Sequence, residues 1–186
     1  MIYLFLAPGF EEVEALTPLD LCRRAGLPTT TVAVAPAEGR AVTGSHGITV
    51  LADLSEAEFA ASYTADTAIE AVILPGGMPG STHLDASPLV DAVLADAAKQ
   101  NAYLCAICAA PMVLGRRGYL SGKRATCYPG FESELTGAIT GGKVVRDGHV
   151  ITAAGMGVAQ EFGLEIIRAL CSDETASAIR DAIQAP

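Results

Sequence analysis

Two hydrophobic patterns alternate along this chain, and together they predict its fold class. A continuous apolar run, typical of a parallel strand buried on both faces, opens the chain at 1–7, and further strands are predicted at 29–35, 68–77 and 102–108. Segments with apolar residues at helical spacing or with helix-favouring composition lie at 8–26, 87–100, 109–118, 157–171 and 173–183. Strands that alternate with helices predict a mostly parallel sheet with helices on both faces, an α/β three-layer sandwich.

The remaining segments indicate smaller elements. We expect short strands around a Gly-rich turn at 41–54, a further strand at 124–128, and a β-hairpin at 143–154 with Asp147-Gly148 as its turn signal. No internal repeat or interdomain linker interrupts the sequence. The chain is therefore expected to form a single domain over 1–186.

The first predicted helix carries recognisable end signals. Arg23 and Arg24 suit a helix C-terminus, where cations interact favourably with the helix dipole, and Gly26 suits the cap. Pro18 lacks a backbone N–H, so we expect it to kink this helix or to end its first half.

Parallel α/β sheets collect ligands outside the C-terminal ends of their strands. In this sequence that rule selects the three loops "PGFEEVE" at 8–14, "PGGMPG" at 75–80 and "CAAP" at 108–111. These loops hold the chemically distinctive residues of the chain.

Composition narrows the possible functions. The formal net charge of −9 argues against a nucleic-acid surface, which needs basic patches, and leaves no polybasic segment for an anionic membrane. The apolar stretch 102–115, interrupted by Pro111, is shorter than the about 20 residues of a membrane span. The first basic residue is Arg23, unlike a secretory signal, so we expect a cytoplasmic protein.

The five cysteines favour reduced thiols over a disulfide framework, because their number is odd and the domain is of medium size. Cys105 and Cys108 have the spacing of a redox pair, but an extended segment would hold them about 10 Å apart, beyond disulfide reach. The histidines are scattered and no second Cys-x-x-Cys exists, so no metal site is predicted. Buried structural thiols are the expectation for Cys22, Cys105 and Cys171.

Cys108 differs from the other cysteines in its position, where a predicted strand gives way to a helix. The small residues Ala109 and Ala110 follow it, then Pro111, which is tolerated at a helix start. This order resembles a nucleophile elbow, in which a sharp turn lifts one side chain above the sheet and the next N–H points toward an oxyanion position. A helix N-terminus alone lowers a thiol pKa by less than about one unit. Cys108 therefore needs another partner, such as a protonated carboxylic acid.

The loop after the first strand supplies three candidate acids, Glu11, Glu12 and Glu14. Acidic residues at a helix N-terminus are favourable for the helix itself, and that explanation suffices for two of the three. Spacing alone does not choose which acid would pair with Cys108.

The motifs "APGFEEVEAL…RRAG", "VILPGG", "AICAAP" and "FGLEII" resemble the ThiJ/PfpI superfamily, specifically its DJ-one and YajL-like branch. The resemblance runs in order from about residue 2 to residue 170. It implies a flavodoxin-like α/β sandwich, usually a homodimer.

The resemblance also implies roles for individual residues. Cys108 matches the reactive, oxidation-prone cysteine of the family, and Glu14 matches the glutamate that sits protonated against that thiol. Gly76, Gly77 and Ala109 match positions whose backbone N–H groups form an oxyanion-type pocket. The family is linked to glyoxalase activity without added cofactor, to deglycase activity on glycated amines, and to sensing of cysteine oxidation.

This chain departs from the family pattern at positions that bear on the mechanism. Protease-like members carry a histidine directly after the cysteine, where this chain has Ala109, and the later "TCYP" places Tyr128 where a histidine often stands. His46 replaces an arginine in "SHG", and "AGMG" at 154–157 replaces an Arg- or Gln-containing motif. Tyr128 and His46 are therefore possible pocket residues. No histidine at a motif position remains to deprotonate Cys108.

Three functions stay open from the sequence. The first is an enzyme that acts on small reactive carbonyls, converting methylglyoxal to lactate through a hemithioacetal on Cys108, with Glu14 moving the proton. The second is a redox sensor or chaperone-like stress protein that works through oxidation of Cys108. The third, a peptidase or amidotransferase-like hydrolase, needs a base for the thiol.

Overall fold

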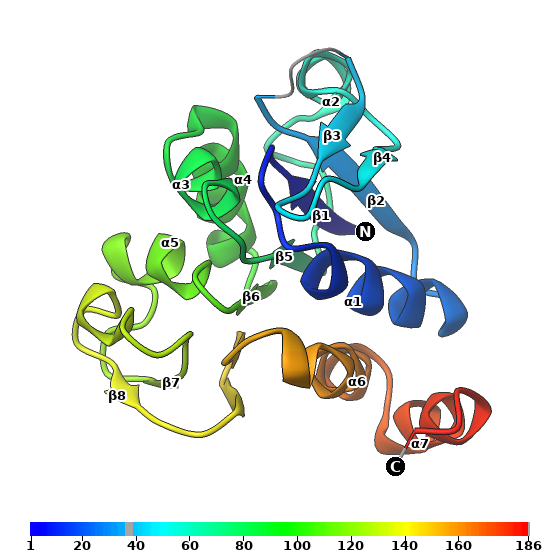
Figure 1. Cartoon of the computed structure of the whole chain (residues 1–186), viewed down its shortest axis with the longest axis vertical. Coiled ribbons are helices and arrows are strands. Elements are labelled where there is room, and N and C mark those ends of the chain that lie inside the picture. Colours follow the sequence, from blue (N-terminus) through cyan, green and yellow to red (C-terminus); the bar gives the residue numbers. More distant parts are fainter. Residues whose placement is uncertain (36–38, 186) are drawn as a thin grey trace.

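The computed structural model describes residues 1–35 and 39–185 of the chain and has a six-stranded sheet as its centre (Figure 1). The strand order is β2-β1-β5-β6-β10-β9. All neighbouring strands are parallel except β9, which pairs antiparallel with β10 at one edge. These six strands are β1 Ile2–Leu6, β2 Thr29–Ala33, β5 Ala71–Leu74, β6 Tyr103–Ile107, β9 Val144–Asp147 and β10 Val150–Ala153.

Helices cover both faces of the sheet, which confirms the predicted α/β class. One face packs against α1 and α6, with α7 outside them, and the other packs against α2, α3, α4 and α5. The helices are α1 Glu12–Arg24, α2 Glu56–Ser62, α3 Gly80–Asp85, α4 Pro88–Lys99, α5 Pro111–Arg116, α6 Ala159–Leu170 and α7 Asp173–Ala182.

Small elements complete the described chain. Two short two-stranded sheets pair β3 with β4 and β7 with β8. Two short 3₁₀ helices, η1 and η2, also occur in the described chain. Their bounds are β3 Ala41–Thr43, β4 Thr49–Leu51, β7 Arg124–Ala125, β8 Ile139–Thr140, η1 Glu132–Glu134 and η2 Met156–Val158.

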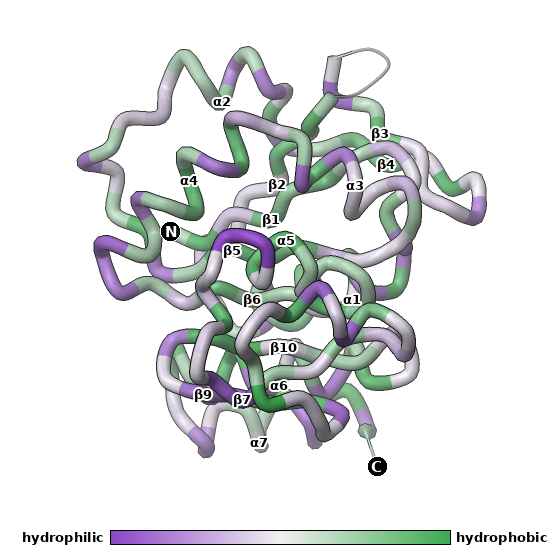
Figure 2. The backbone as a smooth tube through the Cα atoms, turned by 90° about the vertical axis from the view of Figure 1, so that its left-hand side faces the viewer, coloured by the Kyte–Doolittle hydropathy of each residue, from purple (hydrophilic) through white to green (hydrophobic). Residues whose placement is uncertain are grey.

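The apolar strands explain why both faces of the sheet must be covered. Every residue of β1 is buried, and successive side chains enter opposite cores: Leu4 faces α1 and α6, whereas Phe5 faces the α2 side. In Figure 2 the hydrophilic segments lie mainly at turns and outer helix ends. Within the described part of the chain, no helix has both the length and the apolar character that crossing a membrane requires.

Several local predictions need correction. α1 is one helix from Glu12 to Arg24 with Pro18 inside it, so Pro18 does not end its first half. A proline in the middle of a helix costs one backbone hydrogen bond, which the packing of α1 on α6 and the sheet offsets here. In the hairpin Asp147 still pairs with Val150, so the two turn residues are Gly148 and His149 rather than Asp147 and Gly148.

Two helices were absent from the sequence prediction. α2 begins with a capping box in which Ser55 and Glu58 hydrogen-bond each other's backbone, a signal visible in the sequence. α3 has six residues and no side-chain cap, so little in the sequence marks it.

Candidate active site

Cys108 occupies a sharp turn between β6 and α5. Its φ of +65° lies in the left-handed region, which non-glycine residues rarely adopt. Two backbone hydrogen bonds hold this conformation: the Cys108 N–H donates to the carbonyl of Ala153 at 2.8 Å, and the Tyr128 N–H donates to the Cys108 carbonyl at 2.7 Å. The strained elbow predicted from the strand-to-helix transition is therefore present.

Two glycines let the loop after β5 approach the elbow closely. A Cβ at Gly76 would lie 2.4 Å from Oε2 of Glu14 and 2.5 Å from Cβ of Cys108. Gly77 has φ of +88°, and a Cβ there would lie 2.4 Å from the backbone nitrogen of Glu11. Side chains at either position would separate the three loops that the sequence selected.

Glu14 is the acid that reaches Cys108, which answers the question that spacing left open. Its side chain is 1% exposed, and the backbone N–H groups of Gly76 and Met156 lie close enough to its carboxyl group to act toward a lower pKa. The thiol of Cys108 is its polar side-chain neighbour, although Oε2 has no well-aligned hydrogen-bond partner among the described residues. Burial raises the pKa of Glu14 to about 7, and the carboxylate of Glu11 adds to that effect.

The thiol of Cys108 is partly buried, and its surroundings act on it in opposite directions. Burial raises its pKa, and the neighbouring Glu14 carboxylate raises it further. The backbone N–H groups of Gly77 and Ala109 lie close to the sulfur and act toward a lower pKa. The N–H of Gly76 acts on the neighbouring Glu14 carboxyl group.

The two titratable groups form a coupled pair. Two negative charges in one buried site repel each other, so the pair retains at least one proton around neutral pH. When that proton is on Glu14, the repulsion vanishes and the carboxylic acid can donate a hydrogen bond to the sulfur. Glu14 is therefore suited to hold a proton beside a thiolate and to move it.

Comparison with known proteins identifies the family and the fold of this chain. Residues 1–169 match the model of the DJ-1/PfpI family. Protein dj-1beta of Drosophila melanogaster is 37% identical over 174 residues, which covers 92% of this chain and 89% of that protein. The chain belongs to the DJ-1/PfpI family.

Solved structures of this family superpose closely on the chain. The crystal structure of Drosophila melanogaster DJ-1beta has a TM-score of 0.88 at 34% identity, covering 100% of this chain and 97% of that one. An oxidized Toxoplasma gondii DJ-1 has a TM-score of 0.90 at 30% identity, covering 99% and 97%. The flavodoxin-like sandwich expected from the motifs is thus confirmed.

Tyr128 lies beside the Cys108–Glu14 pair of this family member. Its side chain is 52% exposed, and a Cβ at Gly155 would lie 3.4 Å from the Tyr128 ring and 3.9 Å from Oε1 of Glu14. Tyr128 therefore stands at the outer side of the pair, and its backbone N–H also fixes the elbow.

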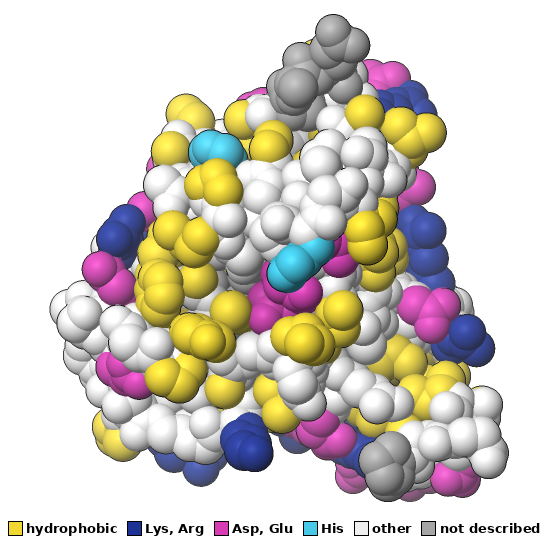
Figure 3. Space-filling view, viewed as in Figure 1, with side chains coloured by type: hydrophobic (Ala, Val, Ile, Leu, Met, Phe, Trp, Pro, Cys, Tyr) yellow, Lys and Arg dark blue, Asp and Glu magenta, His cyan; other side chains and the backbone are white. Residues whose placement is uncertain are grey.

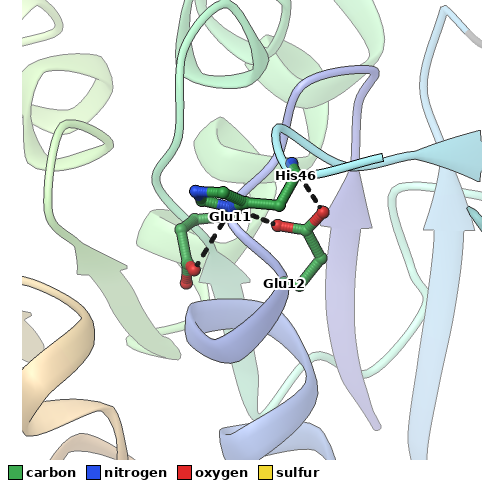
Figure 4. Close-up of side chains that lie close together, drawn as sticks. All are labelled: Glu11, Glu12 and His46. Atoms are coloured by element: carbon green, nitrogen blue, oxygen red, sulfur yellow. Dashed lines mark hydrogen bonds and ion pairs between the residues drawn. The ribbon is translucent and has the colours of Figure 1, made fainter. Parts of the chain in front are cut away.

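His46 belongs to the loop between β3 and β4 and lies against the start of α1, where its ring contacts Glu11 and Glu12. Its Nδ1 is 2.9 Å from Oε2 of Glu12 and 3.9 Å from Oε1 of Glu11 (Figure 4). None of the three histidines is hydrogen-bonded to Cys108 within the described residues. Within one copy of the chain, the structure thus supplies no imidazole base for the thiol.

The other cysteines are free thiols outside the pair. Cys22 and Cys105 are buried, as expected, and burial raises the pKa of Cys22 to about 12. Cys171 is exposed at the end of α6, so the expectation that it would be buried was wrong. It is the C-cap residue of α6, outside the apolar face that the helix turns inward.

The end of β10 and the segment after it contribute to the site in a way that sequence reasoning did not assign. Ala153, the last residue of β10, accepts the hydrogen bond that holds Cys108, and the N–H of Met156 acts toward a lower pKa of Glu14. The signal was visible, because a glycine pair at 155 and 157 directly follows a strand that ends at the ligand-binding edge of the sheet.

Proposed function

We propose that this protein is a cysteine-dependent enzyme that acts on small reactive carbonyls without a cofactor, as a glyoxalase or deglycase-like lyase or hydrolase. The observation that carries the proposal is the partly buried thiol of Cys108, which sits on a strained elbow against the buried Glu14. A relative from Schizosaccharomyces pombe, 28% identical over 100% of this chain and 98% of its own length, is named a glutathione-independent glyoxalase DJ-1.

Catalysis would begin with addition of the Cys108 sulfur to the aldehyde carbon of methylglyoxal. A C–S bond forms, and the carbonyl oxygen becomes an oxyanion that takes a proton, giving a hemithioacetal. The N–H groups of Gly77 and Ala109, which are close to the sulfur, lie where they can stabilise that oxyanion. Glu14 supplies the proton.

Glu14 would next move a proton between the two carbons of the substrate. As a carboxylate it removes the proton from the former aldehyde carbon, and as an acid it returns it to the former ketone carbon. The first carbon is oxidised and the second reduced, so no external oxidant is needed. Water then cleaves the thioester, which releases lactate and the thiol. A pKa of about 7 for Glu14 suits both directions of proton transfer.

Turnover of methylglyoxal to lactate by wild type and Cys108→Ala tests this proposal. We expect the variant to lose at least roughly a hundredfold in kcat/KM, while Cys171→Ala, which removes an exposed thiol outside the site, matches wild type. Equal rates for wild type and Cys108→Ala would refute the proposal.

Redox sensing through Cys108, either directly or in a chaperone-like role, is the second candidate function. The same pair supports it, since a protonated Glu14 can donate a hydrogen bond to an oxidised sulfur, and a related Toxoplasma gondii structure is described as oxidized. Peptide mass spectrometry after mild peroxide treatment tests it. We expect sulfenate and sulfinate on Cys108 first, and earlier oxidation of Cys105 or Cys127 would count against it.

A peptidase or amidotransferase-like hydrolase is less favoured. Such chemistry needs a base for the thiol, and Ala109 stands where protease-like relatives are expected to carry a histidine. Cleavage of a peptide library by wild type but not by Cys108→Ala would reverse this ranking.

The oligomeric state, the cellular location and the partners of the protein are predictions. We propose a homodimer in the cytoplasm whose substrate is a small carbonyl, with no nucleic-acid or membrane partner. A groove of about 670 Å³ beside α1 is lined by Val13, Leu16, Ile48 and Met156 among others, which supports an interface there. Sedimentation equilibrium tests the dimer, and a monomer at micromolar concentration would overturn it.

A further inference from the structure

Glu11, Glu12 and His46 bring three potential ligand atoms together at the start of α1. One nitrogen and two carboxylate oxygens from these residues all lie within 4.8 Å of one another. Figure 4 shows the imidazole between the two carboxylates, and Figure 3 shows a histidine beside acidic side chains on an accessible face. The loop between β3 and β4 supplies His46, 34 positions from Glu12 along the chain.

Each carboxylate fixes one oxygen in the fold and presents the other to the ring. Oε2 of Glu11 accepts the N–H of Glu14 at 2.7 Å, which leaves Oε1 facing His46. Oε1 of Glu12 accepts the backbone N–H of His46 at 2.8 Å, which leaves Oε2 at 2.9 Å from Nδ1. The two free oxygens are thus held in place by bonds that a ligand would not break.

We propose that Glu11, Glu12 and His46 bind a divalent transition-metal cation, for which Zn²⁺ is the representative probe. One imidazole nitrogen with two carboxylate oxygens suits such ions better than Ca²⁺ or Mg²⁺, which prefer oxygen alone. Ligands about 2.1 Å from one ion lie about 3.0–3.4 Å apart. The observed separations of 2.9 and 3.9 Å from Nδ1, with all three ligand atoms within 4.8 Å of one another, require the Glu11 carboxylate to move closer.

The surroundings of the cluster permit a bound cation. The helix dipole places roughly half a positive elementary charge at the start of α1, which disfavours a cation there. The negative charge of the two carboxylates is larger and outweighs it. The His46 side chain is 70% exposed, so water can complete the coordination sphere. The hydroxyl of Ser45 lies 3.1 Å from Nδ1 of His46 and makes a long 3.4 Å contact with Oε2 of Glu12. This hydroxyl can rotate away to admit an ion.

A metal ion competes with protons for the ring nitrogen of His46. A proton on Nδ1 would lie in the 2.9 Å contact with Oε2 of Glu12. A metal ion replaces that proton, and affinity for Zn²⁺ therefore falls as the pH decreases. None of the three ligands is hydrogen-bonded to Cys108 in the described structure, but Glu11 also accepts the backbone N–H of Glu14 and raises the pKa of its carboxyl group, so a cation bound here would act on that pKa as well.

A purely structural role for His46 makes a different prediction from a metal site. The backbone N–H of His46 holds Glu12 whichever side chain stands at 46, so His46→Gln keeps that contact and removes only the ligand nitrogen. His149→Gln is the matched control, because His149 lies at the β9–β10 turn against Tyr103.

Zn²⁺ titration by calorimetry at pH 7.5, in a Cys108→Ser/Cys171→Ser background that lacks the two unburied thiols, tests the proposal. We expect one saturable site with buffer-dependent proton release, weakened roughly tenfold or more by His46→Gln and by Glu11→Gln and unchanged by His149→Gln. On the unsubstituted protein, NMR should show the His46 ring signals shifting while those of His83 and His149 stay.

Either of two results would overturn the proposal. One is the absence of saturable binding in the background protein. The other is binding whose affinity His46→Gln leaves unchanged, together with His46 ring signals that do not respond to Zn²⁺ in the unsubstituted chain.

Discussion

Two glutamates at the start of α1, two positions apart, are both buried and yet titrate in opposite directions. Glu12 is 4% exposed and Glu14 is 1% exposed. Burial acts to raise the pKa of both, but the side chain and backbone N–H of His46 outweigh it at Glu12 and lower its pKa to about 2. At Glu14 burial prevails, and the pKa rises to about 7.

The difference lies in the partners, because the two residues share one helix end and similar exposure. Glu12 faces a histidine that can be cationic and N–H groups that donate to it, so its charged form is stabilised. Glu14 faces a thiol and the nearby Glu11 carboxylate, so its neutral form is stabilised. The first turn of α1 thus holds Glu12, which stays negatively charged at neutral pH, beside Glu14, which can bind and release a proton.

Removing the space around Glu14 should have the largest effect. Gly76→Ala places a methyl group 2.4 Å from Oε2 of Glu14 and 2.5 Å from Cβ of Cys108, so we expect a loss of about 3 kcal/mol in unfolding free energy and of measurable turnover. Gly157→Ala is the control, since a Cβ there meets no atom within 4 Å. Urea unfolding and methylglyoxal turnover measure both. Equal behaviour of the two variants would contradict the close packing.

Neutralising Glu14 should remove proton transfer while keeping the shape of the site. We expect Glu14→Gln to reduce kcat by about a hundredfold or more, whereas Glu12→Gln stays within a few-fold of wild type when both are folded. Steady-state kinetics with methylglyoxal at pH 7 compares them. Similar losses in the two variants would mean that Glu14 has no special part in the reaction.

The two glutamates should also give stability opposite pH dependences. The folded pKa of Glu14 lies above the ordinary 4.5, so its contribution to stability is lost as the pH rises from 4.5 toward 7, by at most on the order of 3 kcal/mol. The folded pKa of Glu12 lies below 4.5, so its contribution is lost as the pH falls from 4.5 toward 2.

Urea unfolding at pH 5 and pH 8 separates the Glu14 effect from the rest of the chain. Between these values wild type should lose stability relative to Glu14→Gln, which has no carboxyl group to ionise. Parallel curves for the two proteins would show that Glu14 titrates normally.

Neutralising Glu12 should have the smallest effect, confined to stability. Glu12→Gln replaces a charge-assisted hydrogen bond to His46 with a neutral one, and we expect a loss of about 1–2 kcal/mol at pH 6. The difference should shrink as the pH falls toward 2, where wild-type Glu12 also becomes neutral. Thermal unfolding at both values checks this, and a difference that persists at low pH would contradict the assigned charge.

Local patterns were enough to place most elements and the elbow. The fully apolar β1, the helical spacing in α6 and the "CAAP" turn each carry their signal within a few residues, because strand burial, helix amphipathicity and proline geometry act locally. Some predictions failed because such a signal was lacking or was overridden by packing, whereas α2 was missed although its capping box is visible in the sequence. α3 has no cap, and α1 passes through Pro18 because its contacts with α6 hold it.

The sequence by itself determined the α/β class, the place of Cys108 at a strand-to-helix turn and, through its motifs, the family. The spacing of the acids in "PGFEEVE" did not distinguish them, and their different surroundings follow from the tertiary structure. Residues that adjoin in the chain point in different directions around a helix, so Glu14 meets Cys108 from β6 while Glu12 meets His46 from a distant loop. A pKa depends on such neighbours in space, which the spacing of three glutamates does not encode.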